Sequence, residues 1–225
     1  MLPESLLAAY LLVCLGFFFA VNLDNIRSGK RWRRPGDRTS TKVERPIFIP
    51  AVLAMLGTVT YFVEVVLYSL AALTGSTSTL NIPALSLDFM LELNVQILGL
   101  AFTGAGCLLF IWSVVARGKY AVSWDMPEDQ RLVTWGPYQW IRHPSYLGYF
   151  LMFFGFVLLW PNLLALPPLL AIPGYIRVTF DEEKLLIHHF GEKYLEYQRK
   201  TGRFIPRLLR VGGGRGLQPI SFNRQ

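Results

Sequence analysis

The stretch Ser145–Val178, SYLGYFLMFFGFVLLWPNLLALPPLLAIPGYIRV, decides the fold class of this chain. It holds two apolar runs separated by Pro161-Asn162. Proline cannot continue the interior of a helix, so this dipeptide favours the turn of a helical hairpin. Backbone groups in hydrocarbon need internal partners, so both runs are expected to be helices. Each is short for a full membrane span, which takes about 20 residues.

Three further apolar blocks precede this hairpin. Hydrophobic residues make up 52% of the chain and run together in blocks rather than in short periodic stretches, which excludes an ordinary soluble core. The predicted fold class is therefore an all-α integral membrane protein with about five transmembrane helices. The predicted spans are Ser5–Val21, Pro46–Leu73, Leu91–Ala116, Ser145–Trp160 and Leu163–Val178. The first is interpreted as a retained span, because no basic region precedes its apolar run.

Lysines and arginines fall on one side of this five-span arrangement. A dense group lies between the first two spans, whereas Thr74–Met90 and Pro161-Asn162 contain none. Cytoplasmic loops carry an excess of positive charge, so we expect the N-terminus outside and the C-terminus in the cytosol. Topology and contact with anionic membrane lipids account for the net charge of +7. Nucleic acid is therefore not an expected partner.

The chain is predicted to form a single membrane-embedded domain over residues 1–225, because it shows no internal repeat. Residues 1–116 would hold three spans, residues 117–210 the functional hairpin, and residues 211–225 a disordered tail. Asp181–Lys200 is predicted to be a cytosolic amphipathic helix, since its apolar residues recur at helical spacing. Cys14 and Cys107 lie within spans and are interpreted as packing residues.

A first polar cluster stands directly before the fourth span. Arg142-His143 precedes Pro144, which pushes His143 out of the helical region and is well placed to open a helix. A helix N-terminus suits a polar or anionic ligand. The alternative is that Arg142 and Tyr146 merely anchor the span at the membrane surface.

A second polar cluster follows the fifth span. Asp181-Glu182-Glu183 would be favourable at the start of a helix because of the helix dipole, which is a sufficient structural reason for it. However, the two arms of a hairpin begin and end at the same membrane face. His143, Tyr146, Arg177 and Glu182 are therefore expected to converge, and an arginine there is a natural clamp for a carboxylate or phosphate.

The two clusters together resemble the signature of the isoprenylcysteine carboxyl methyltransferase family, whose wider group includes phospholipid N-methyltransferases. The resemblance covers Gln130–Arg207. It rests on Gly136-Pro137-Tyr138, Arg142-His143-Pro144-Ser145-Tyr146, Glu182-Glu183 with Leu185, Phe190-Gly191, Tyr194 with Tyr197, and Thr201-Gly202-Arg203-Phe204-Ile205-Pro206.

This resemblance implies an S-adenosyl-L-methionine-dependent methyltransferase. It makes Arg177 the catalytic residue that holds the carboxylate of a lipophilic substrate, such as a C-terminal isoprenylcysteine. The cofactor-binding residues that it implies are Gln130, Arg131, Leu132, Val133, Tyr138, His143, Pro144, Ser145, Tyr146, Glu182 and Glu183.

Two other functions stay open beside methyl transfer to a carboxylate. A carboxylate is ionised at neutral pH and needs no general base, whereas an amine such as phosphatidylethanolamine must lose a proton, for which Glu183 is the base candidate. A non-catalytic transporter or scaffold would need polar residues spread through several spans, and only Glu64 and Asn94 qualify. Glu64 is itself a functional hypothesis, because ionisable groups inside a membrane are costly.

Several other residues have simpler interpretations. Adjacent residues on a helix point in different directions, so His188 and His189 do not form a metal site with each other, and no metal is expected. Gly99, Gly104 and Gly106 in the third span are interpreted as positions of close helix packing.

Overall fold

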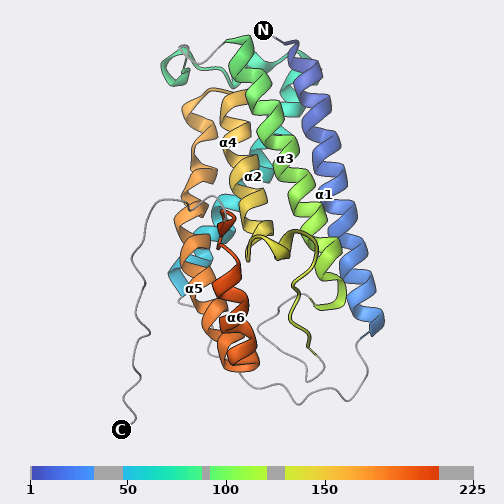
Figure 1. Ribbon diagram of the computed structural model, residues 1–225. Coiled ribbons are helices and arrows are strands. Elements are labelled where there is room, and N and C mark those ends of the chain that lie inside the picture. The colour runs from blue at the N-terminus through green and yellow to red at the C-terminus, as the bar shows by residue number, and fades with distance from the viewer. Residues whose placement is uncertain (1, 33–47, 88–91, 121–129, 208–225) are drawn as a thin grey trace.

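The computed structural model describes residues 2–32, 48–87, 92–120 and 130–207. The described chain is helical, and the predicted tail at 211–225 lies outside it. Its long helices run side by side as one bundle, with the N-terminus at one end and the helix α6 at the other (Figure 1). The α-helices are α1 Glu4–Trp32, α2 Phe48–Thr74, α3 Leu93–Arg117, α4 Pro144–Leu159, α5 Ala171–Phe190 and α6 Glu192–Lys200.

Four helical segments are long and apolar enough to cross a membrane, which makes this an integral membrane protein. They are Glu4–Arg27, Ile49–Thr74, Leu93–Arg117 and Leu163–Phe190. The fourth predicted span corresponds to α4, which has 16 residues. At 1.5 Å of rise per residue, α4 covers about 24 Å, less than the roughly 30 Å of a hydrocarbon core. The shortness expected for this arm is therefore present in the structure.

The second arm of the hairpin differs from the prediction. Residues after the Pro161-Asn162 turn form two 3-10 turns, Leu163–Ala165 and Pro167–Leu170, before α5 begins at Ala171. Asn162 opens the first of them by accepting a 2.9 Å hydrogen bond from the backbone N–H of Leu164. Consecutive prolines at 167 and 168 keep this part of the chain out of a regular helix.

The predicted break between the fifth span and a surface helix starting at Asp181 is wrong. α5 runs without interruption through Asp181-Glu182-Glu183 and ends at Phe190, because no glycine or proline interrupts it after Gly174. The chain breaks instead at Gly191, whose φ of 57° favours glycine, and α6 follows. The three acidic residues therefore lie in the second half of a helix and not at its start.

The two arms of the hairpin pack against different helices. α4 packs mainly against α3, whereas α5 packs mainly against α2. Side-chain rings connect the arms, and Tyr175 of α5 lies 4.6 Å from Tyr146 and 5.4 Å from Tyr149 of α4, measured between ring centroids. Fully buried Phe153 and Phe156 of α4 lie in the main apolar core.

Glycines allow α3 and α4 to approach closely. A Cβ atom on Gly106 of α3 would lie 2.6 Å from the carbonyl oxygen of Gly148 in α4. A Cβ on Gly99 would lie 3.0 Å from the carbonyl oxygen of Gly155. Gly104 instead faces the Tyr10 ring of α1. The prediction that Gly99, Gly104 and Gly106 are packing positions is thus confirmed.

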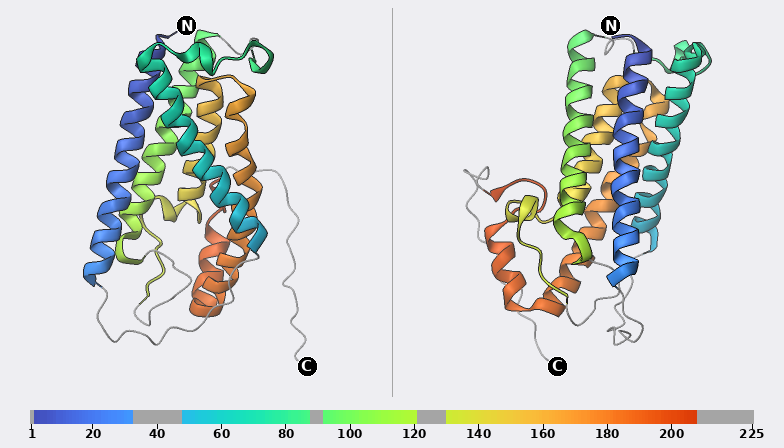
Figure 2. Two further views of the ribbon diagram at one scale, coloured as in Figure 1. Left: turned by 180° about the vertical axis from the view of Figure 1, so that it is seen from behind. Right: turned by 90° about the vertical axis from the view of Figure 1, so that its right-hand side faces the viewer.

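A second, smaller apolar cluster lies beyond the bundle. It joins α5 to α6, which folds back beside the last turns of α5 (Figure 2). Its buried members recur along the two helices at the predicted spacing: Leu185, Leu186, Tyr194 and Tyr197. This cluster fixes α6 against α5 and so builds one wall of the candidate site.

Candidate functional site

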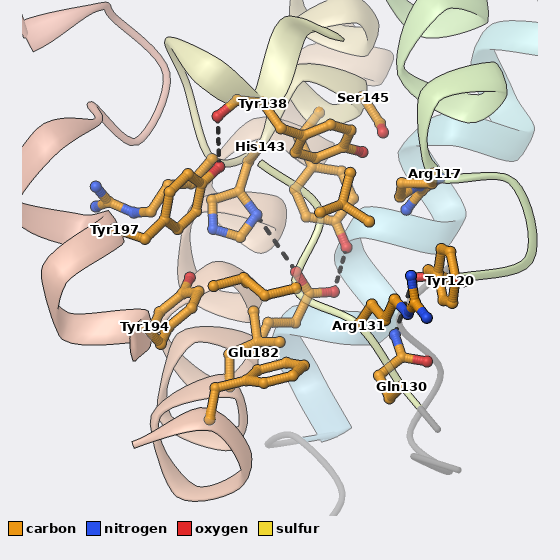
Figure 3. Close-up of a pocket in the computed structure, with 16 residues that line it drawn as sticks. Arg117, Tyr120, Gln130, Arg131, Tyr138, His143, Ser145, Glu182, Tyr194 and Tyr197 are labelled. Atoms are coloured by element: carbon orange, nitrogen blue, oxygen red, sulfur yellow. Dashed lines mark hydrogen bonds and ion pairs between the residues drawn. The ribbon is translucent and has the colours of Figure 1, made fainter. Parts of the chain in front are cut away.

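A cleft of about 740 Å³, including the solvent at its mouth, lies between the bundle and α6. The segment before α4 forms one side, and α5 with α6 forms another (Figure 3). The lining residues are Arg117, Tyr120, Gln130, Arg131, Leu132, Val133, Tyr138, Arg142, His143, Ser145, Tyr146, Glu182, Leu186, Phe190, Tyr194 and Tyr197.

A tight turn places Tyr138 at the cleft. Gly136 has a φ of 61°, and a Cβ there would lie 2.9 Å from Cβ of Ala116, so the turn packs directly onto the end of α3. The hydroxyl of Tyr197 in α6 donates a 2.6 Å hydrogen bond to the backbone carbonyl of Tyr138. Burial raises the pKa of the Tyr138 hydroxyl, which therefore stays neutral and able to donate a hydrogen bond.

His143 lies between two carboxylates. As predicted, it has a non-helical backbone and directly precedes Pro144, the first residue of α4. Its Nδ1 is 3.5 Å from Oε2 of Glu182, and its Nε2 is 3.1 Å from Oε1 of Glu183. Burial by itself disfavours the imidazolium, but the hydrogen bonds and charges of both glutamates outweigh it, and the pKa of His143 is raised.

Glu183 is the centre of a buried ion cluster. Its side chain is 6% exposed, and both of its oxygens are engaged. It accepts hydrogen bonds from Arg142 Nε at 2.8 Å, His143 Nε2 at 3.1 Å, Gln198 Nε2 at 3.1 Å and Arg203 at 3.1 and 2.8 Å. A buried carboxylate normally needs such partners to remain ionised.

Glu182 is the acidic group on the wall of the cleft. Its Oε1 accepts a 2.5 Å hydrogen bond from the hydroxyl of Tyr146. The Tyr146 ring lies nearly parallel to the imidazole of His143, with centroids 5.7 Å apart. Tyr146 and His143 thus hold this carboxylate in place while its side chain keeps 19% exposure.

Two arginines also line the cleft. Arg117 is the last residue of α3, and its buried Nε has no hydrogen-bond partner among the described residues. Arg131 lies with its guanidinium carbon 6.0 Å from the ring centroid of Tyr120. Gln130 donates a 2.9 Å hydrogen bond to the carbonyl of Tyr120. A buried guanidinium N–H without a partner is costly, so Arg117 is well suited to an anionic ligand.

The structure brings most of the predicted cofactor residues to one cavity. Those that line it are Gln130, Arg131, Leu132, Val133, Tyr138, His143, Ser145, Tyr146 and Glu182. Pro144 and Glu183 do not line it. Pro144 is buried at the start of α4, and Glu183 faces the ion cluster described above.

The structure does not bring Arg177 to the predicted position. Its side chain is exposed and does not line the cleft. The contact that the structure gives it is with Phe180, at 6.0 Å between the guanidinium carbon and the ring centroid. His143, Tyr146 and Glu182 therefore converge on the cleft as expected, whereas Arg177 does not line it.

The sequence reasoning left Arg117 and Tyr120 without a role. Both stand where the resemblance to the family is weak, directly after the third span. The sequence did contain one indication that Arg117 is functional, because its positive charge stands directly at the end of an apolar span. Leu186, Phe190, Tyr194 and Tyr197 belong to the predicted amphipathic face, and the structure adds that this face lines the cleft.

One further candidate, Glu64, lies away from the cleft. Glu64, in α2, has a buried Oε2 without a partner among the described residues, and it does not line the cavity. Within the described ranges, no group of three or more His, Cys, Asp or Glu side chains is placed to hold a metal ion.

Residues 95–193 match the phospholipid methyltransferase family. The protein-S-isoprenylcysteine O-methyltransferase of Homo sapiens is 32% identical over 136 residues, which are 53% of this chain and 48% of the human protein. The Xenopus laevis protein of that name is 32% identical over 144 residues, 62% of this chain and 50% of the relative. The Saccharomyces cerevisiae protein of the same name is 37% identical over 119 residues, which are 46% of this chain and 48% of the yeast protein. The chain thus spans about half the length of these relatives.

Among solved structures, the chain is similar to the eukaryotic intramembrane Ras methyltransferase, isoprenylcysteine carboxyl methyltransferase. The TM-score is 0.47 at 21% identity, over 90% of this chain and 69% of the other. The chain is thus a helical membrane protein in its described residues, and its residues 95–193 are similar to phospholipid methyltransferases. The curated relatives that it resembles are named protein-S-isoprenylcysteine O-methyltransferase.

Proposed function

We propose that this protein transfers a methyl group from S-adenosyl-L-methionine to the carboxylate of a lipophilic substrate such as a C-terminal isoprenylcysteine. One observation carries the proposal furthest. One cleft at the end of an apolar helix bundle is lined by an acidic group, Glu182, and by the half-buried Arg117, whose buried Nε has no hydrogen-bond partner among the described residues. The relatives' names agree with this reaction.

The residues of the cleft fit this cofactor. S-adenosyl-L-methionine supplies an activated methyl group, and it carries an ammonium, a carboxylate and an aromatic base. Glu182 would hold the ammonium, because its carboxylate faces the cleft and is already fixed by Tyr146. Phe190 and Tyr194 offer rings to cover the cofactor's apolar surface.

We assign the acceptor carboxylate to Arg117 in place of Arg177. Arg117 ends the apolar helix α3 and lines the cleft, so it lies where a lipid-borne carboxylate would reach the cofactor. A guanidinium offers two parallel N–H donors to one carboxylate, which fixes the orientation of the attacking oxygen. Such orientation lowers the barrier by bringing the reacting atoms into line.

The engagement of Glu183 favours a carboxylate acceptor over an amine. An ionised carboxylate needs no general base, whereas an amine must lose a proton. Glu183 was the base candidate for an amine, but Arg142, His143, Gln198 and Arg203 occupy its oxygens. It is therefore poorly placed to accept a proton from a substrate.

We further propose that the cleft opens to the cytosol. Tyr194 and Tyr197 of α6 line the cleft, and α6 lies at the end of the bundle opposite the N-terminus (Figure 1). The lining of the cleft includes Arg117 and Arg131, which belong to the basic side of the sequence. Positive charge marks the cytoplasmic side, where a water-soluble cofactor is available. The lipid chain of the acceptor would remain among the apolar helices.

The test uses purified protein in detergent with lipid and methyl-labelled S-adenosyl-L-methionine. A farnesylated cysteine analogue and phosphatidylethanolamine are offered separately. We expect label on the farnesylated cysteine that alkali releases as methanol, as for a methyl ester. Alkali-stable label on the phospholipid would instead assign N-methylation. Absence of cofactor binding would overturn methyl transfer altogether.

A further inference from the structure

The segment Thr201–Arg207, named the strap here, crosses the start of α4. It follows α6 and returns beside the residues that precede Pro144. The backbone N–H of Arg142 donates to the carbonyl of Gly202 at 2.8 Å, and that of His143 donates to the carbonyl of Arg203 at 3.1 Å. Gly202 N–H donates back to the carbonyl of Trp140 at 3.1 Å. The backbone of the strap is thus fixed to the wall of the cleft.

Arg203 of the strap donates two parallel hydrogen bonds to Glu183. Its Nε donates to Oε1 at 3.1 Å, and its Nη2 donates to Oε2 at 2.8 Å. The guanidinium also lies over the ring of Phe180, 3.8 Å from the centroid. This two-pronged geometry fixes the plane of the Glu183 carboxylate as well as neutralising it. Arg203 itself does not line the cleft.

Glu183 connects Arg203 to the cleft through His143. The imidazole contacts Glu183 through Nε2 and Glu182 through Nδ1. Tyr146 then holds the other oxygen of Glu182. An unbroken series of side-chain contacts therefore leads from the strap to the acidic group that lines the cleft.

We propose that Arg203 is a positioning residue for cofactor binding, acting through Glu183 and His143 on Glu182. The proposal rests on the proposed function, since it assigns the cofactor's ammonium to Glu182. Ligands inside a site are often oriented by hydrogen-bonded partners outside it. The strap would thereby help to set the shape of the cleft.

The electrostatic surroundings of His143 support this coupling. The charged groups that face it are Glu182 and Glu183 from α5, with Arg142 beside it in the chain and Arg203 across Glu183. Tyr146 covers one face of its ring, and Phe204 of the strap lies 6.0 Å away. Loss of Arg203 would leave Glu183 held by fewer donors and free to turn, which would release the imidazole from its position.

The first experiment measures binding of S-adenosylhomocysteine to the full chain by titration calorimetry. The variants are Arg203→Ala, Arg203→Lys, Glu182→Gln and the double variant Arg203→Ala/Glu182→Gln. Arg199→Ala is the matched control, because Arg199 is exposed and pairs with exposed Glu192. We expect Arg203→Ala to weaken binding about tenfold, as for loss of a charge-assisted hydrogen-bond pair. Lysine should recover part of the loss, and the control should bind as the parent does.

The double variant decides whether Arg203 acts through Glu182. If it does, Arg203→Ala should weaken binding less than about twofold when Glu182 is already Gln, because coupled residues are not additive. Equal losses in both backgrounds, or no loss in the parent background, would overturn the proposal. A merely structural role would lower the thermal midpoint without this dependence on Glu182.

A second readout does not depend on the cofactor. The histidine pKa is measured by NMR on labelled protein, with the His143 signal assigned by its loss in His143→Gln. Removing Arg203 should lower the pKa of His143 toward its unfolded value, because a Glu183 carboxylate that turns away no longer stabilises the imidazolium. If the parent does not bind S-adenosylhomocysteine, the proposed function fails. The coupling of the strap to His143 is then tested by this pKa shift alone. An unchanged pKa of His143 in Arg203→Ala would overturn it.

Discussion

The hydroxyl of Tyr146 in the first turn of α4 donates a 2.5 Å hydrogen bond to Oε1 of Glu182 in the second half of α5. The two residues line the same cleft, although α4 and α5 pack mainly against different helices. This bond therefore joins the two arms of the hairpin at the point where the cofactor is proposed to bind.

Tyr146→Phe removes that bond and retains the ring. We expect S-adenosylhomocysteine to bind about tenfold more weakly, because the Glu182 carboxylate loses a donor and is less well oriented. Titration calorimetry checks the affinity. Tyr10→Phe is the matched control, since its hydroxyl donates to the carbonyl of Leu100 within the bundle. An equal loss in both variants would argue against a specific role for Tyr146.

The variants Arg117→Ala and Arg177→Ala test which of the two arginines holds the acceptor carboxylate. We expect Arg117→Ala to lower methyl transfer to farnesylated cysteine at least a hundredfold, because a buried bidentate contact to the reacting group is lost. Arg177→Ala should retain activity within about twofold, since its side chain is exposed and does not line the cleft. Activity lost only in Arg177→Ala would restore the sequence-based assignment.

Glu183→Ala should destabilise the folded protein strongly. It leaves Arg142, Arg203 and the His143 imidazolium without their shared partner. Breaking a buried ion pair costs about 3–5 kcal/mol. The measurement is the thermal unfolding midpoint in detergent. Glu192→Ala removes an exposed carboxylate from its pair with Arg199 and should change the free energy of unfolding by less than about 1 kcal/mol.

Stability should fall as the pH rises through the titration of His143. The pKa of this imidazole is raised in the folded protein above its unfolded value of about 6.5. Its contribution is therefore fully present below about pH 6.5 and is lost as the pH rises through the folded-state pKa. One proton gives a slope of at most about 1.4 kcal/mol per pH unit.

The thermal midpoint measured across this pH range checks the titration. His143→Gln should remove the slope, whereas His188→Gln should keep it, because His188 is exposed and lies outside the ion cluster. A slope that survives in His143→Gln would assign the titration to another group.

Gly106→Ala should destabilise the bundle. The added Cβ would lie 2.6 Å from the carbonyl oxygen of Gly148 and 2.9 Å from the backbone nitrogen of Met152, so α3 and α4 must move apart. Overpacking of this kind costs about 1–3 kcal/mol. Gly16→Ala is the control, because nothing lies within 4 Å of the added atom. In a helix, that substitution should be neutral or slightly stabilising.

The sequence by itself determined the features that depend on local chemistry. The apolar runs predicted which stretches are helical, since any such run in a membrane must be helical. They did not give all the ends, because α1 continues to Trp32 and α5 covers Ala171–Phe190. Pro161-Asn162 and His143-Pro144 marked a turn and a helix start, because proline restricts the chain locally. Most of the residues that line the cleft were named together by the family resemblance, whose motifs are short stretches of neighbouring residues.

Only the tertiary structure decided which way each helical side chain points. Glu182 and Glu183 are adjacent, yet successive side chains on a helix are about 100° apart. Glu182 therefore faces the cleft, and Glu183 faces Arg142 and Arg203. Arg117 and Arg177 both stand near the ends of apolar runs, and nothing local distinguishes them. The direction of each was decided by the helices it packs against, and that packing brings together residues far apart in the sequence.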